Sequence, residues 1–364
     1  MEPLKEMFNN VYFQKLVNVV SSVYPPLNKK TFFSELTDDL EVKSLNERLR
    51  HTSKVLQTHL PARFEDAIVI LDQVIPRMEK GYTALVFPDF VGCFGKDKEE
   101  ISLAALKRYT IYGSSEFAIR EFLKKDFEKT LSVMRTWLRD PNLHVRRLVS
   151  EGSRPRLPWS FKLDAVIRNP EFTAPILTAL CADPELYVKK SVANHLNDIS
   201  KDHPDYMMGL VKKWDRKNDH TSWIVKHASR TLIKKGNKTA LRLFDVRHTI
   251  QVKLDHFKLS PKSIQLGQTL HVEFYLKSES KKAQKLIVDY IIEYRTKSGG
   301  LSSKVFKLKE LVLSAGQEVF ISKNQRLMDF TTRKHYPGKH KLSIQVNGII
   351  NHTVEFKLST SQKP

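Results

Sequence analysis

The stretch VRRLVSEGSRPRLPW, from Val145 to Trp159, gathers four arginines, one acid and one tryptophan in fifteen residues. It begins with the helical spacing of Val145, Leu148 and Val149, breaks at Gly152 and continues as a loop with two prolines. Guanidinium groups at a helix end and in the loop that follows suit phosphate oxygens, which they bind with paired donors. The stretch therefore predicts a site that holds nucleic acid.

The same helical pattern recurs twice further along the chain. The segments LRDPNLHVRRLVSE, CADPELYVKKSVANHLND and KNDHTSWIVKHASRTLIKKG align on one another, and each places a valine before a basic residue. Val145, Val188 and Val225 are 43 and 37 residues apart, close to the period of about 40–47 residues in HEAT repeats, each of which is a pair of helices. We therefore expect successive helix pairs to stack into a superhelical solenoid.

Basic residues occupy equivalent places on the second helix of each repeat. Stacked repeats would line them along one concave face, where they would follow a phosphate backbone, although a solvated charged face is the alternative. The formal net charge of +21 favours a polyanionic partner, nucleic acid before an anionic membrane surface. The predicted DNA-binding residues are Arg146, Arg147, Arg154, Arg156, Lys189, Lys190, Lys226, His227 and Arg230.

Near His248 the pattern changes from helices to short alternating segments. The segments are HTIQVKLDHFKLS, TLHVEFYLKS, KLIVDYIIEYRT, SSKVFKLKELVLS, HKLSIQV and HTVEFKLS, and Asn347-Gly348 between the last two is a strong hairpin signal. About seven strands over roughly 110 residues are typical of an antiparallel, immunoglobulin-like β-sandwich.

We therefore expect a multidomain α and β protein. Residues 1–247 would form an N-terminal all-α, HEAT-like superhelical solenoid that binds DNA and carries the active site, and residues 248–364 the C-terminal antiparallel β-sandwich. The net charge is +10 before residue 248 and +11 from there on. The sandwich would either clamp nucleic acid or stabilise the fold passively.

Composition limits the other possibilities. An apolar content of 41% and a charged content of 28% are typical of a globular chain. Cys93 and Cys181 are the only cysteines, too few for a disulfide framework or a thiolate metal cluster, and a reducing cytosol fits. The N-terminus MEPLKEMF does not resemble a signal peptide, and no run of about 18 apolar residues predicts a membrane span.

Carboxylates are the remaining candidates for chemistry. The sequence has no phosphate-cradling glycine loop, HEXXH, paired CXXC or Gly-X-Ser-X-Gly motif, and its 13 histidines show no clear metal spacing, so neither a metal nor another cofactor is expected. Glu151 ends the helix of the first repeat, and its alternative role is an ion pair with Arg154 or Arg156. Asp198 ends the helix of the second repeat, where the helix dipole disfavours an anion unless Lys201 relieves it.

A third acid and an indole complete the candidates. Glu116, in YGSSEFAIREF, falls in the first turn of a helix predicted over residues 115–125, where an acid is normally a cap. Trp159 follows Pro158 in a basic loop, which is less typical of a core residue. Trp137 and Trp223 lie on amphipathic helices, and we expect both in the core.

The runs RRLVSEGSRPRLPW, DPELYVKKSVANHLNDISKDHP and SWIVKHASRTLIKKGN resemble the AlkC branch of the HEAT-like DNA alkylation repair glycosylases, with similarity over roughly residues 1–245. Some members of that branch carry a C-terminal immunoglobulin-like domain. The resemblance implies hydrolytic removal of 3-methyladenine and 3-methylcytosine from double-stranded DNA without full extrusion of the base, unlike the usual glycosylase strategy. It implies that Glu151, Asp198, Trp159 and Glu116 form the active site of a monomeric, cytoplasmic enzyme.

The chemistry of these residue types fits that reaction. Methylation at N3 makes the base cationic and a good leaving group, so the positive charge that grows on the sugar is what a nearby carboxylate must stabilise. The face of Trp159 attracts the cationic base or sugar, and no lysine nucleophile is required. Two other classes stay open: a non-catalytic HEAT scaffold that binds nucleic acid or an acidic partner, and a membrane-surface adaptor.

Overall fold

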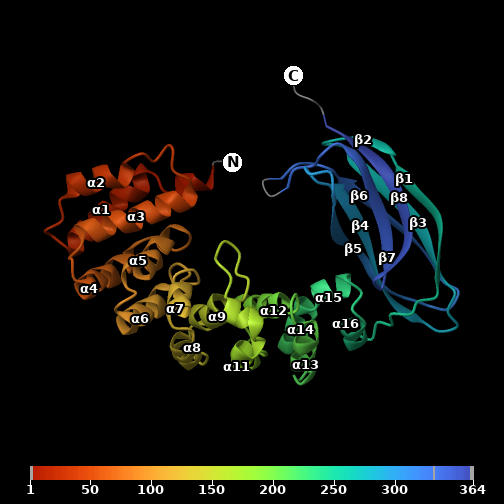
Figure 1. The fold of residues 1–364 in the computed structure, drawn as a ribbon, viewed down its shortest axis with the longest axis horizontal. Coiled ribbons are helices and arrows are strands. Elements are labelled where there is room, and N and C mark those ends of the chain that lie inside the picture. Colours follow the sequence, from red (N-terminus) through yellow and green to blue (C-terminus); the bar gives the residue numbers. More distant parts are fainter. Residues whose placement is uncertain (1–2, 331–332, 361–364) are drawn as a thin grey trace. The chain divides into compact units, whose positions relative to one another are not determined.

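The computed structural model describes residues 3–330 and 333–360, which form helices followed by strands (Figure 1). The chain divides into two compact units, residues 1–228 and 229–364. The helical segments are η1 (Leu4–Met7), α1 (Asn10–Val23), α2 (Lys29–Thr37), α3 (Leu45–His59), α4 (Phe64–Val74), η2 (Ile75–Arg77), η3 (Thr83–Leu85), α5 (Val86–Phe94), α6 (Glu99–Tyr109), α7 (Ile119–Lys125), α8 (Phe127–Thr136), α9 (Leu143–Gly152), α10 (Asp164–Arg168), η4 (Pro170–Thr173), α11 (Ala174–Ala179), α12 (Leu186–Ile199), α13 (Pro204–Lys212), α14 (Asp219–Ala228), α15 (Arg230–Lys234) and α16 (Lys238–Leu243). The strands are β1 (Val252–Ser260), β2 (Ser263–Gln265), β3 (Thr269–Ser278), β4 (Gln284–Arg295), β5 (Leu301–Leu313), β6 (Glu318–Arg326), β7 (Gly338–Val346) and β8 (Ile349–Ser359).

Helix pairs follow one another in chain order through the first unit, from α1 to α14 (Figure 1). Helices α9, α12 and α14 pack in sequence, α12 between the other two. Val145, Val188 and Val225 are buried at equivalent places on these three helices. The structure therefore confirms the predicted repeat, in which buried valines join neighbouring second helices. No helix of the described residues is long and apolar enough to cross a bilayer.

The second unit contains two sheets that pack around a shared core. The three-stranded sheet has the order β1-β3-β6, and the five-stranded sheet has the order β2-β8-β7-β4-β5. Large apolar side chains such as Phe274, Leu286 and Ile344 fill the space between them. Pairing is antiparallel except at the short strand β2, which runs parallel to β8. The predicted sandwich is confirmed, and β2 and β6 are strands that the alternating pattern did not reveal.

The hairpin between β7 and β8 turns at Asn347 and Gly348, as predicted. Both residues have positive φ, 49° and 82°, the backbone conformation that a two-residue type I′ turn requires. The Asn347 side chain also donates to the backbone carbonyl of Arg247 at 2.7 Å. The turn therefore fixes the register of the β7–β8 hairpin, and its Asn347 side chain also holds the backbone at Arg247, just before β1.

The first helices after residue 228 belong with the sandwich. Gln345 donates from its side chain to the backbone carbonyl of Lys234 in α15 at 2.9 Å. Leu241 and Val246 bury their side chains against Ile287 of β4. The division between compact units therefore precedes the residue 248 expected from the change of pattern, because α15 and α16 bury their apolar faces on a sheet.

Asp289 of β4 gives the second unit a pH-dependent stability. Its side chain is buried, and burial raises its pKa to about 6, against the opposing charges of Lys234 and Lys307. The folded state therefore binds a proton more tightly than the unfolded chain, whose aspartates titrate near about 3.9. Stability is lost as the pH rises from about 4 to about 6, and the loss persists above that range.

We therefore expect Asp289→Asn to raise the free energy of unfolding by about 2 kcal/mol at pH 7.5 and to change it little at pH 4. Urea denaturation of the variant and the natural chain at both pH values measures this difference. An equal effect at the two pH values would contradict the role of Asp289 ionisation.

Candidate active site

Three carboxylates from separate segments of the helical unit meet around two arginines. Glu116 precedes α7, Glu151 lies in the last turn of α9, and Asp198 lies in the last turn of α12. Arg154 joins two of them, since Nη1 donates to Glu151 Oε1 at 2.7 Å and Nε donates to Asp198 Oδ2 at 2.9 Å. We call Glu116, Glu151 and Asp198 the carboxylate cluster.

Arg147 connects the third acid to the other two. Its Nη1 forms an ion pair with Glu116, and Nη2 lies 3.5 Å from Glu151 Oε1. At the other end of the cluster, Lys201 Nζ donates to Asp198 Oδ1 at 2.8 Å, as expected from its place after the helix. The like charges of the carboxylates are thus held together by cations placed between them, which is how proteins keep acids close to one another.

Two acids of the cluster are buried. Glu151 and Asp198 are only 6% and 2% exposed, and Arg154 is buried with them. Burial lowers the pKa of Arg154, but the charges of Glu151 and Asp198 outweigh this and raise it overall. Each of these two acids is therefore enclosed with a guanidinium partner, and the ion pair with Arg154 considered for Glu151 is present.

Trp159 lies at an exposed point of the loop that follows α9. Its side chain is 80% exposed, and its backbone has φ +64°, a strained conformation for a residue other than glycine. In Figure 1 this loop, in yellow-green between α9 and α12, extends away from the helices. An exposed indole in a strained backbone is a feature of binding sites rather than of a core, in line with the prediction.

Arg120 of α7 holds the ends of this loop. Its side chain is fully buried, and Nη1 donates to the carbonyl oxygens of Gly152 at 3.0 Å and Arg154 at 2.7 Å, while Nη2 donates to that of Phe161. Burial, followed by the charge of Arg154, lowers its pKa to about 10. One arginine therefore positions both the exposed indole and the guanidinium that joins two carboxylates.

A cavity of about 570 Å³ lies beside the Trp159 loop, and Ser114 in its wall contacts one acid of the carboxylate cluster. Trp159 and Phe161 line it together with Ser114 and the α3 side chains of Arg50 and Lys54. Ser114 Oγ donates to Glu116 Oε2 at 3.0 Å and accepts from Arg147 Nη1 at 2.7 Å. Ser114 therefore connects the cavity that Trp159 lines to Glu116 and Arg147.

Glu116 lies outside the helix predicted for it. The helix begins at Ile119, so Glu116 occupies the preceding turn, where its N–H donates to Ser114 Oγ at 3.4 Å. Its carboxylate turns to Arg147 of the next repeat instead of the N–H groups of α7. The expected capping role is therefore replaced by an ion pair in the cluster.

Two arginines predicted to grip phosphates have carboxylate partners inside the protein. Arg146 Nε donates to Asp183 Oδ2 at 2.7 Å, and Nη1 donates to the carbonyls of Asp140 and Pro141. Arg156 Nη2 donates to Asp202 Oδ1 at 2.8 Å. Both pairs join residues of successive repeats, so these arginines, like Arg154, have a structural role within the free protein.

The basic residues on α12 and α14 surround Trp223. Lys189 Nζ lies 3.1 Å from His220 Nδ1 and 5.7 Å from the centroid of the Trp223 ring system. Trp223 stacks on His227 with centroids 4.9 Å apart. Trp223 is therefore partly exposed beside basic residues and not in the core, in contrast to Trp137, which is buried as predicted.

Lys190 and Lys226 are exposed on the same two helices, α12 and α14. Arg230 begins α15 and belongs to the second unit. The predicted DNA-binding set is thus distributed over both units.

Arg120 and Ser114 were not singled out from the sequence. The signal for Arg120 is its place directly after Ala118 and Ile119 and two residues before Phe122, since all three of these apolar residues are buried. A buried arginine needs several acceptors, so such a position points to a structural anchor. Ser114 has no comparable signal, because its role depends on contacts with another repeat.

His195 of α12 lies beside the cluster without contributing a charge. It is fully buried, its Nδ1 lies 3.0 Å from the carbonyl oxygen of Ser150, and burial lowers its pKa to about 3. It is therefore a neutral packing residue at ordinary pH. No three His, Cys, Asp or Glu side chains of residues 3–330 and 333–360 are grouped to hold a metal ion.

Two protein families match separate parts of the chain. Residues 107–232 match the DNA alkylation repair enzyme family, and residues 253–360 match the C-terminal Ig-like domain of the uncharacterised protein YhaZ. The first match contains the whole carboxylate cluster and the Trp159 loop. Fold and site together define a class of DNA alkylation repair proteins made of helical repeats and an Ig-like domain.

Full-length relatives narrow this class. The uncharacterized protein YhaZ of Bacillus subtilis (strain 168) is 40% identical over 359 residues, which cover 98% of this chain and 100% of YhaZ. The structure of the Pseudomonas fluorescens alkylpurine DNA glycosylase AlkC, bound to DNA containing an abasic site analog, is similar with a TM-score of 0.95 and 44% identity, over 98% of this chain and 100% of that one. The chain belongs to the AlkC-type family of HEAT-like DNA alkylation repair proteins with a C-terminal Ig-like domain.

Proposed function

We propose that the chain is a DNA glycosylase that hydrolyses the N-glycosidic bond of cationic N3-alkylated bases, 3-methyladenine and 3-methylcytosine, in double-stranded DNA. The observation that carries this proposal is the carboxylate cluster, which Ser114 connects to the cavity lined by the exposed Trp159, in a chain 44% identical to an alkylpurine DNA glycosylase. The enzyme would act as a monomer in the cytoplasm, without a cofactor.

The cluster suits a reaction in which positive charge develops on the sugar. A cationic base needs no protonation to leave, so catalysis depends on negative charge fixed near the sugar and on orientation of the attacking water. Arg154 binds both Asp198 and Glu151 and holds them in place. Because the two carboxylates are already positioned, they need little reorganisation during the reaction. In the complex, DNA phosphates would also interact with the arginines of the site. The arginines would then offset less of the carboxylates' negative charge, which would stabilise the positive charge on the sugar.

Trp159 would contact the lesion while the base remains in the duplex. A cation over an indole face gains about 0.5–2 kcal/mol, so the exposed ring favours an alkylated base over a neutral one. The loop positions this ring outside the helices, and no full extrusion of the base is then required. A lyase step would need a free amine as nucleophile, and Lys201, the lysine next to the cluster, is paired with Asp198. We therefore expect hydrolysis of the N-glycosidic bond without cleavage of the DNA strand.

The direct test is release of free base. The natural chain is incubated with duplex DNA that carries 3-methyladenine or 3-methylcytosine, and the freed base is measured by chromatography. We expect release of the base with the DNA strand left uncut. Tight binding of the same DNA without release would replace the proposal with a non-catalytic scaffold.

Substitution of Trp159 separates its chemical role from its structural one. Trp159→Gly removes the ring, and glycine adopts the positive φ without strain. We therefore expect the free energy of unfolding to stay unchanged or to rise by up to about 1 kcal/mol. We expect base release to slow by about tenfold, the factor that about 1.4 kcal/mol of cation–π attraction provides. Trp159→Phe keeps an aromatic face and should retain most of the rate. Equal rates for the Gly and Phe variants would exclude a role for the ring.

A further inference from the structure

A second cavity, of about 370 Å³, lies beside the carboxylate cluster and is lined by cations. Its walls come from the loop that leads into η3, the loop that follows α6 and the first turns of α9. The charged or titratable nitrogen groups that line it are Lys80, His144 and Arg147. No Asp or Glu is among the described residues that line it.

Of the two permanent cations, Arg147 also pairs with Glu116 and Glu151, whereas Lys80 contacts an aromatic ring. Lys80 Nζ lies 5.4 Å from the ring centroid of Tyr112, and it forms no ion pair with a described residue. The Arg147 guanidinium lies 4.5 Å from the ring centroid of Tyr187, and the His144 ring meets the same tyrosine edge to face. The ring of Tyr112 orients the Lys80 ammonium without neutralising its charge, so Lys80 is the cation of this cavity that can attract an anion most strongly.

The electrostatics of His144 are consistent with a positive cavity. Burial, followed by the charges of Lys80 and Arg147, lowers its pKa. Tyr187 packs against the ring, and Glu116, which pairs with Arg147, does not line the cavity. An anion placed among Lys80, His144 and Arg147 would reverse the effect of the two cations and favour the charged imidazole.

We propose that this cavity binds a backbone phosphate of DNA through Lys80, His144 and Arg147. Phosphate contacts of this kind position a protein on DNA and account for much of its affinity. The inference rests on the proposed function only in taking DNA as the partner. Arg147 contacts both the cavity and Glu116, so a phosphate bound here lies one side chain away from the carboxylate cluster.

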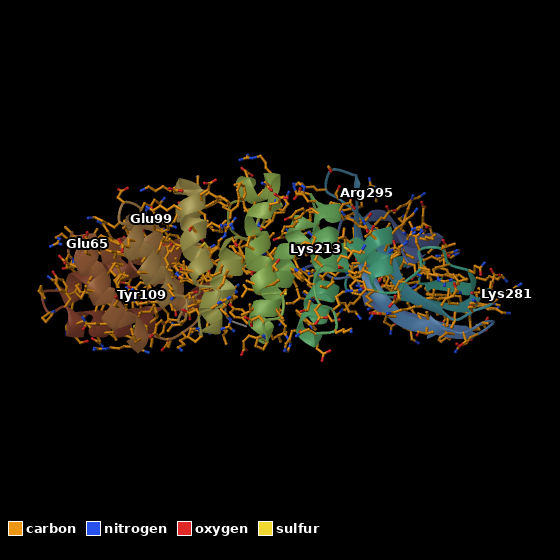
Figure 2. All side chains as sticks on the ribbon, turned by 90° about the horizontal axis from the view of Figure 1, so that it is seen from below. Glu65, Glu99, Tyr109, Lys213, Lys281 and Arg295 are labelled. Carbon is orange, nitrogen blue, oxygen red and sulfur yellow. The ribbon has the colours of Figure 1, made fainter. Side chains whose placement is uncertain are left out.

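Binding of duplex DNA that contains an abasic site analog tests the proposal, because such DNA has no base to release at that position. Fluorescence anisotropy gives the Kd over a series of salt concentrations for the natural chain, Lys80→Gln, His144→Gln and the double variant. We expect each single variant to bind about 3- to 10-fold more weakly, and Lys80→Gln to reduce the slope of log K against log salt by about 0.9. The matched control is Lys213→Gln, at the exposed lysine that directly follows α13 (Figure 2) and does not line the cavity.

A Kd and salt slope equal to those of the natural chain in the double variant would overturn the proposal. Inorganic phosphate provides a second arm, since it should shift the NMR signals of the His144 ring in the natural chain and not in Lys80→Gln. A phosphate-induced shift without any change in DNA affinity would assign the cavity to free phosphate and equally overturn the proposal. Failure of the natural chain to release alkylated bases would refute the glycosylase function alone, because DNA binding is measured separately.

Discussion

Asp198→Asn is expected to lower the rate of base release by about 100- to 1,000-fold, the usual loss when one fixed electrostatic group of an active site is removed. Asp198 is the most buried acid of the cluster, 2% exposed, and it accepts from both Arg154 and Lys201. The substitution keeps the shape of the side chain and removes its negative charge. Single-turnover base release from DNA with 3-methyladenine, at saturating enzyme, measures the effect on chemistry apart from DNA binding.

Two further variants make this result specific. Glu151→Gln removes the other carboxylate that Arg154 contacts and should also reduce the rate strongly. Asp202→Asn removes the partner of Arg156, an ion pair nearer the surface, and should change stability by less than about 1 kcal/mol and the rate little. Equal rates for Asp198→Asn and Asp202→Asn, with both variants folded by circular dichroism, would remove Asp198 from the catalytic machinery.

The repeats and the sandwich were predictable because their signals are local. Val145, Val188 and Val225 recur at the period of stacked helix pairs, and all three are buried where this period places them. The Asn347-Gly348 turn is encoded by two adjacent residues with positive φ. Strand β6 gave no such signal, since Ile321 is its only buried residue.

The partners of the arginines were not predictable, because they lie in other repeats. From the sequence, Arg146 and Arg156 were predicted to bind phosphates, and the structure pairs them with Asp183 and Asp202. The burial of Glu151 follows from the same contacts, since Arg154 folds back over it from the loop. Composition thus left open which basic side chains face solvent and which pair with carboxylates inside the protein.

Arg120→Met is expected to lower the free energy of unfolding of the helical unit by about 3–5 kcal/mol. The arginine is fully buried, and its loss leaves the carbonyl oxygens of Gly152, Arg154 and Phe161 without their donors. Each buried acceptor left unpaired costs about 1–3 kcal/mol, offset in part by the desolvation of the lost charge. Thermal unfolding of the full chain, followed by circular dichroism at the helical signal, measures the shift, about 10 °C downward.

Arg108→Met is the matched control. Arg108 lies in α6 of the same helical unit and forms a partly exposed ion pair with Asp72, and such pairs contribute less than about 1 kcal/mol. Arg120→Met should also slow base release at temperatures where the variant is folded, since the backbone of Trp159 keeps its strained φ only while the surrounding loop is held. Arg120→Lys retains the charge and part of the bonding, so we expect intermediate values of both quantities. If Arg120→Met unfolds at the same temperature as Arg108→Met, the loop carbonyls have other donors, and the loop that presents Trp159 does not depend on Arg120.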